Sequence, residues 1–128
     1  MTEGTAPVSP GTEVPKPWGS EFIWAVTDQY VGKILNISAG HKLSLQYHEL
    51  KDETILVLEG RLLLHTGTSE SDVTTVELGP GEFRHIPPGL VHRYEAIVDT
   101  KLVEASTSQL DDVVRLVDDY GRQGTSQA

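Results

Sequence analysis

The stretch GHKLSLQYHELKDE, running from Gly40 to Glu53, combines a predicted strand with polar residues at a fixed spacing. Gln46 and His48 are two residues apart on that strand, so their side chains point to the same face. Glu53 follows across a polar turn and can face them from the next strand. His92 is separated by two residues from a distant Pro-Pro-Gly turn. A closed barrel can bring these four polar side chains together.

The rest of the chain supports such a barrel. From Trp18 onward, short and often alternating apolar runs are broken by Gly, Pro, Asn and Asp about every ten residues, a rhythm typical of antiparallel β-structure. Many short strands in a small chain predict an all-β barrel or double-sheet jelly roll. The predicted strands are Glu21–Val26, Val31–Ile37, Lys42–His48, Thr54–Glu59, Arg61–Thr66, Thr74–Leu78, Phe83–Ile86, His92–Ala96 and Leu102–Ala105.

Both ends of the chain differ from this pattern. Residues 1–15 are rich in Pro, Gly, Ser and Thr without apolar periodicity, which predicts a disordered arm. Residues 16–122 form the single predicted domain, and residues 123–128 form a flexible tail.

The pattern changes after Ser106. Leu110, Val113, Val114 and Val117 follow the i, i+3, i+4, i+7 spacing of an amphipathic helix, and a glycine stands where a C-terminal cap belongs. A short C-terminal α-helix packed outside the barrel is therefore predicted.

Charge and composition exclude several classes of protein. The 128 residues leave room for one domain, and 10 Lys and Arg against 19 Asp and Glu give a net charge of −9. Such a field repels nucleic acid and anionic membranes, so neither is an expected partner. No cysteine is present, which leaves five histidines and the carboxylates as metal ligands. No long apolar run or signal-like N-terminus is seen, so a cytoplasmic location is expected.

Two spaced segments carry a family resemblance. Gly40–Glu53, with Gly60 after it, resembles the first cupin motif, and Gly81–Ala96 resembles the second. The resemblance implies the cupin double-stranded β-helix, a jelly-roll barrel. A narrower resemblance is to the type II mannose-6-phosphate isomerase domain, which that family fuses to a mannose-1-phosphate guanylyltransferase domain. The matching segments are Lys16–Gly19, Leu43–His48, Ile86–Arg93 and Asp112–Arg122.

The narrower resemblance implies a divalent metal, typically zinc, held by Gln46, His48, Glu53 and His92. It also implies an aldose–ketose isomerisation between mannose 6-phosphate and fructose 6-phosphate at that metal. The chemistry of these residues is consistent with that reaction. Two imidazoles, one carboxylate and one neutral amide around Zn²⁺ leave the site with a net positive charge, which can polarise a carbonyl. The alternative is a hydrogen-bonded polar network that binds no metal.

Proton transfer and substrate binding need further residues. Lys42 lies four residues before Gln46, so strand parity points its side chain into the same interior, although a solvated rim position is also open. His85 can face inward as a base or outward as a surface residue. Lys42 and His85 are the predicted catalytic residues. The predicted substrate-binding residues are Lys42, Lys51, Arg84 and Arg122.

Departures from the family pattern keep other functions open. Lys42 and Lys51 stand where the type II pattern usually has arginine, and lysine lacks the bidentate fork that suits phosphate. A cupin that binds a sugar or carboxylate without turnover is the first alternative to an enzyme acting on a sugar phosphate. An iron-dependent oxygenase is disfavoured, because Gln46 replaces an imidazole that such sites use. A homodimer is expected, since an isolated small barrel leaves edge strands open.

Overall fold

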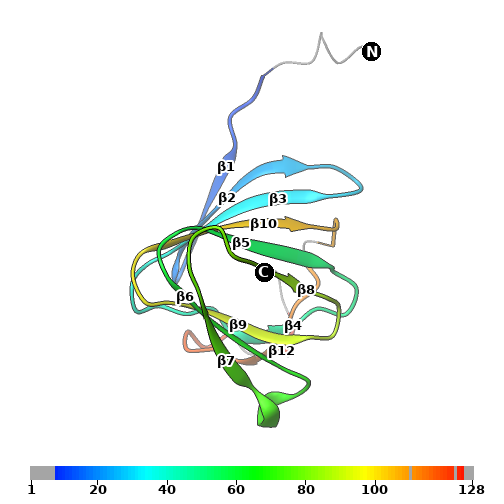
Figure 1. The fold of residues 1–128 in the computed structure, drawn as a ribbon. Helices are drawn as coiled ribbons and strands as arrows, with labels where there is room; N and C mark the ends of the chain where they lie inside the picture. Colours follow the sequence, from blue (N-terminus) through cyan, green and yellow to red (C-terminus); the bar gives the residue numbers. More distant parts are fainter. Residues whose placement is uncertain (1–7, 110, 123, 126–128) are drawn as a thin grey trace.

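The computed structural model describes residues 8–109, 111–122 and 124–125, and it shows two six-stranded antiparallel sheets that face each other (Figure 1). The first sheet has the order β1-β2-β3-β10-β5-β8 and the second the order β12-β11-β4-β9-β6-β7. The strands are β1 (Thr12–Lys16), β2 (Gly19–Val26), β3 (Val31–Ile37), β4 (Leu45–Tyr47), β5 (Glu53–Glu59), β6 (Leu62–Gly67), β7 (Thr74–Leu78), β8 (Phe83–Ile86), β9 (Val91–Ala96), β10 (Thr100–Ser106), β11 (Val114–Val117) and β12 (Gly124–Thr125).

Strand alternation fills one end of the barrel with apolar side chains. Ile55 and Val57 on β5 and Leu102 on β10 are completely buried, as are Leu62 and Leu64 on the opposite sheet. Each such side chain contributes about 1.5–3 kcal/mol when it leaves water. This core holds the two sheets face to face.

The same inward faces carry charged residues toward the other end. Glu104 on β10 stands opposite Lys33 on β3 in the strand register, and Glu53 begins β5. Glu21 on β2 is buried with them. The barrel interior is therefore divided into an apolar part and a polar part, and the polar part positions the candidate site.

The predicted all-β barrel is confirmed, and each predicted strand overlaps an observed one. The largest difference concerns Lys42–His48, which shortens to β4. Lys42 forms only an isolated bridge, with Glu95, and the continuous strand begins at Leu45.

The predicted C-terminal helix is wrong. Val114–Val117 form β11, which pairs with β4, and no α-helix occurs among the described residues. Of the four apolar residues at helical spacing, Val114 and Val117 lie in this short strand, whose register shifts between Arg115 and Val117. The valines favour the strand, because β-branched side chains suit a pleated surface. Leu110 of the predicted helix lies outside the described residues.

The predicted terminal boundaries also differ from the structure. The arm expected over residues 1–15 includes most of β1, whose Thr12–Lys16 pairs along β2. The tail expected over residues 123–128 includes Gly124–Thr125, which pairs with β11. Residues 1–7, 123 and 126–128 lie outside the described part. Within that part, no helix is long and apolar enough to cross a membrane.

The outer face of the first sheet carries a continuous apolar row. Phe22, Ile34, Val103, Leu56 and Phe83 stand directly opposite one another on five successive strands. Phe83, at the end of this row, is 69% exposed, and the other four residues are partly exposed. Contiguous exposed apolar surface is typical of interaction sites, so this row is where we expect a second copy of the chain to pack.

The homodimer stays a prediction, and this row allows it to be tested. Phe83→Asp places a charge on the row and is expected to shift the protein from dimer to monomer in size-exclusion chromatography with light scattering. Val76→Asp, at an exposed position of β7 in the other sheet, is the matched control and should leave a dimer. A monomeric wild-type protein at micromolar concentration would contradict the prediction.

Candidate metal centre

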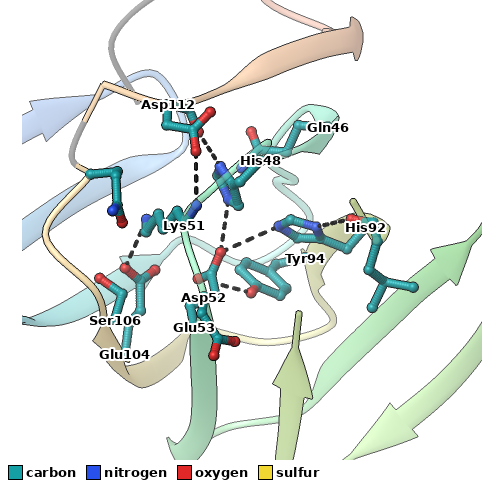
Figure 2. Close-up of polar contacts among 12 residues, drawn as sticks. Gln46, His48, Lys51, Asp52, Glu53, His92, Tyr94, Glu104, Ser106 and Asp112 are labelled. Atoms are coloured by element: carbon teal, nitrogen blue, oxygen red, sulfur yellow. Dashed lines mark hydrogen bonds and ion pairs between the residues drawn. The ribbon is translucent and has the colours of Figure 1, made fainter. Parts of the chain in front are cut away.

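Three donor atoms converge inside the polar part of the barrel (Figure 2). Nε2 of His48, Oε1 of Glu53 and Nε2 of His92 all lie within 4.8 Å of one another, and all three residues are buried. Glu53 Oε1 is 2.8 Å from His48 Nε2 and 3.6 Å from His92 Nε2. Even so, none of the three atoms has a properly aligned hydrogen-bond partner. Buried polar atoms without partners are costly, and their convergence fits a shared cation.

Both imidazoles are held in the tautomer that a metal ligand needs. His48 donates from Nδ1 to the main-chain oxygen of Asp112, and His92 donates from Nδ1 to that of Leu90 at 2.9 Å. A carbonyl oxygen only accepts, so the proton sits on Nδ1 in each ring. The Nε2 lone pairs are therefore left facing Glu53, which is the arrangement found around protein-bound metals.

Burial and neighbouring charges tune this cluster. Burial lowers the pKa of His92 to about 4, so its imidazole is neutral at neutral pH. Burial by itself would raise the pKa of Glu53, but the surrounding polar groups, among them the charged Lys51, outweigh it and hold that pKa below its usual range. The centre thus presents one carboxylate and neutral imidazole nitrogen, a donor set suited to zinc or a similar divalent ion.

Tyr94 and Gln46 complete the immediate surroundings. Tyr94 on β9 donates its hydroxyl to Glu53 Oε2 at 3.3 Å, and burial raises the pKa of this phenol, which keeps the proton in place. Gln46 stands opposite His92 in the strand register, and its Oε1 accepts a hydrogen bond from Ser44 at 2.6 Å. Its role as a fourth ligand stays a prediction.

A small cavity of about 30 Å³, enough for one or two water-sized groups, is lined by two of the three donor residues, His48 and Glu53. Two buried ion pairs stand in its wall, Lys33–Glu21 at 3.3 Å and Lys51–Glu104 at 3.2 Å. The cavity is lined by Trp18, Glu21, Lys33, Leu35, Leu43, Gln46, His48, Lys51, Glu53, Tyr94, Glu104, Arg115 and Arg122.

Two of the predicted substrate-binding residues reach this cavity. Lys51 is buried in its wall. Burial alone would lower the pKa of Lys51, but Glu104 and Glu53 raise it and keep the ammonium charged. Arg122 lies on the wall with its side chain 26% exposed, and its guanidinium is paired with Asp118.

The other predicted residues lie away from the cavity. Lys42 forms an ion pair with Asp119 at 3.6 Å on the half-exposed rim. His85 is 55% exposed on the outside of the barrel and contacts Asp52 at 2.6 Å. Arg84 alternates with His85 and faces inward beside Ile55 in the register, but it does not line the cavity. Of the two orientations left open for His85, the structure shows the outward one.

Sequence reasoning missed several residues of the site. Tyr94 shares a strand face with His92, two residues away, and that parity could have identified it. Glu104 and Lys33 lie on two of the predicted strands, but their inward positions were not predicted; a buried charge in such a position signals a special role. Asp112 and Arg115 had no usable signal, because the predicted helix placed them elsewhere.

The chain belongs to the cupin family, because the family model described as a cupin domain matches residues 33–105. Over 115 residues it is 32% identical to the mannose-1-phosphate guanylyltransferase of Escherichia coli and 30% identical to the alginate biosynthesis protein AlgA of Pseudomonas aeruginosa. These matches cover 86% of this chain but only 23% of each relative.

Solved structures confirm the fold. The capsular polysaccharide assembling protein CapF from Staphylococcus aureus is similar with a TM-score of 0.65 at 20% identity. The match covers 89% of this chain and 33% of CapF. Such a likeness shows the shared barrel, while the sequence relatives carry the closer comparison.

The low pKa of His92 predicts how the metal-free protein responds to acid. In the unfolded chain this imidazole is protonated below about pH 6.5, whereas in the folded protein it is protonated only below about pH 4. The folded state therefore loses stability relative to the unfolded state as pH falls from about 6.5 to about 4. At pH 5 the loss is about 2 kcal/mol. His92→Gln should lose less stability than wild type between pH 7 and pH 5 in urea unfolding. Parallel losses in the two proteins would refute a neutral buried His92.

Proposed function

We propose that this cupin domain is a metal-dependent aldose–ketose isomerase acting on a sugar phosphate, of the mannose 6-phosphate to fructose 6-phosphate type. The observation that carries the proposal is the convergence of the donor atoms of His48, Glu53 and His92, none of which has an aligned hydrogen-bond partner, next to a cavity that His48 and Glu53 line. The likeness over 115 residues to a mannose-1-phosphate guanylyltransferase supports a sugar phosphate as the substrate class.

The residues present fit a divalent metal, most simply zinc, with Gln46 as an additional ligand. Such an ion would polarise a substrate carbonyl and lower the barrier to removing the neighbouring proton. Around it, the protein contributes a fixed geometry. Tyr94 orients the Glu53 carboxylate by its hydrogen bond, and the two Nδ1–H donors fix the imidazole rings.

The size of the cavity determines how a sugar phosphate would be placed. About 30 Å³ admits the oxygen-bearing reacting end of a substrate, whereas a whole hexose phosphate is several times larger. The phosphate therefore stays at the mouth. Arg122 is partly exposed on the cavity wall, and we propose that its guanidinium, which is paired with Asp118, contacts the phosphate, because guanidinium groups suit phosphate.

Isomerisation also needs a group that removes a proton from C2 and returns it to C1. Lys42 and His85 lie too far out on the surface to reach the cavity. Glu104 is buried in the cavity wall, and its Oε2 is in contact with Lys51 without accepting an aligned hydrogen bond. We assign this proton transfer to Glu104, which exchanges the proton with the substrate carbon.

Metal content and proton exchange test the proposal together. Wild-type protein is expected to contain near-stoichiometric zinc or another divalent metal by elemental mass spectrometry, and to wash deuterium from D₂O into C1 or C2 of the sugar phosphate. His48→Ala removes one donor and should lose both properties. His41→Ala changes an exposed histidine outside the cavity and should keep both.

The outcomes separate the alternatives. A wild-type protein that stays metal-free after divalent metal is added would contradict the isomerase proposal. Metal binding with a thermal shift on adding sugar phosphate, but without deuterium exchange, would instead identify a binding protein that does not turn over its ligand.

Substitution of Glu104 separates metal binding from proton transfer. Glu104→Gln keeps the size of the side chain but removes its basic oxygen, so exchange should fall by about 10²–10⁴-fold. The metal content should match wild type, because Glu104 lies outside the three-residue donor group. Exchange at the wild-type rate would show that another group moves the proton.

A further inference from the structure

The group that fixes His48 comes from a distant part of the chain. The main-chain oxygen of Asp112 accepts the Nδ1–H of His48, although the two residues are 64 positions apart. Without this acceptor the His48 ring can rotate or change tautomer, and its Nε2 then no longer faces Glu53. Asp112 is thus in direct contact with the donor cluster but does not belong to it (Figure 2).

The side chain of Asp112 makes a second attachment. Its carboxylate accepts hydrogen bonds from three consecutive main-chain N–H groups, those of Glu49 at 3.0 Å, Leu50 at 2.7 Å and Lys51 at 2.8 Å. Charge-assisted hydrogen bonds to a carboxylate are stronger than neutral ones. One side chain therefore closes the turn that joins His48 to Glu53.

This turn sets the separation of two donors. His48 precedes the three bonded N–H groups and Glu53 follows them, so the turn fixes where each donor starts. The last of the three residues is Lys51, whose ammonium group turns inward to Glu104. The same attachment thus helps to aim a charged group into the cavity wall.

Pairing of the C-terminal strand brings Asp112 to this position. β11 runs antiparallel to β4, with Val114 opposite Tyr47 and Arg115 opposite Gln46. Val113, next to Asp112, is buried at 2% exposure and anchors the segment. Asp112 itself does not line the cavity, so any effect on ligands there passes through His48 and the turn.

We propose that Asp112 is a positioning residue for the metal centre, and that the segment leading into β11 completes the centre by carrying it. The inference rests on the metal binding in the proposed function. It assigns no contact between Asp112 and the metal or the substrate.

The test compares Asp112→Asn and Asp112→Ala with Asp111→Asn, a change at the exposed neighbouring aspartate. Asp112→Asn keeps the size and the main-chain oxygen but loses the anionic acceptor. Both substitutions keep the main-chain oxygen but remove side-chain hydrogen bonds that hold it against His48. Loosening a group that orients a metal ligand lowers metal affinity by about 10–100-fold, which we expect for both Asp112 variants in Co²⁺ titrations against a chelator. Asp111→Asn should bind Co²⁺ like wild type.

A second measurement needs no metal. Nitrogen-15 NMR of the His48 ring should show the proton on Nδ1 in wild type and in Asp111→Asn, and a mixture of tautomers in Asp112→Ala. Far-UV circular dichroism and thermal unfolding of Asp112→Asn confirm that a change in affinity occurs in a folded protein.

Two results would overturn the inference. One is Co²⁺ affinity in folded Asp112→Asn equal to that of wild type, and the other is an unchanged His48 tautomer in Asp112→Ala. A wild-type protein that binds no metal contradicts the proposed function instead, and the NMR measurement then still decides whether Asp112 positions His48.

Discussion

The buried carboxylate of Glu53 is the constraint on which the polar half of this barrel depends. An ionised carboxylate removed from water without partners costs several kcal/mol even after the protein relaxes. Here His48 and His92 approach one of its oxygens, Tyr94 donates to the other, and Lys51 supplies positive charge nearby. Every one of these groups is buried, so removing any of them leaves a charge or donor unmatched inside the protein.

Burial of apolar side chains in the other half of the barrel offsets the free-energy cost of these buried charges. Its completely buried residues, such as Ile55, Val57 and Leu102, alternate along the same strands that carry Glu53 and Glu104. One strand therefore supplies both core and site, and the rigidity of the packed end extends to the donors. Sites built on strands hold their geometry better than sites built on mobile loops.

Much of the charge near the predicted motifs is already neutralised. Lys42 is paired with Asp119, Lys51 with Glu104, and Arg122 with Asp118. The sequence shows that basic residues lie close to the motifs, but it cannot show which acidic residue the fold brings to each one. Strand parity also failed for Lys42, because the buried run from Leu43 to Gln46 interrupts the alternation on which that argument rested.

The sequence by itself determined the barrel and its three central donors. Alternating apolar residues and Gly- and Pro-containing turns specify short strands. His48, Glu53 and His92 come together in the structure as the sequence predicted, because strand geometry fixes which face of its strand each side chain occupies. The tertiary structure alone decided that Val114–Val117 form a strand and that Asp112 reaches the turn after His48. Such contacts join residues more than sixty positions apart, and local periodicity carries no information about pairing over that separation.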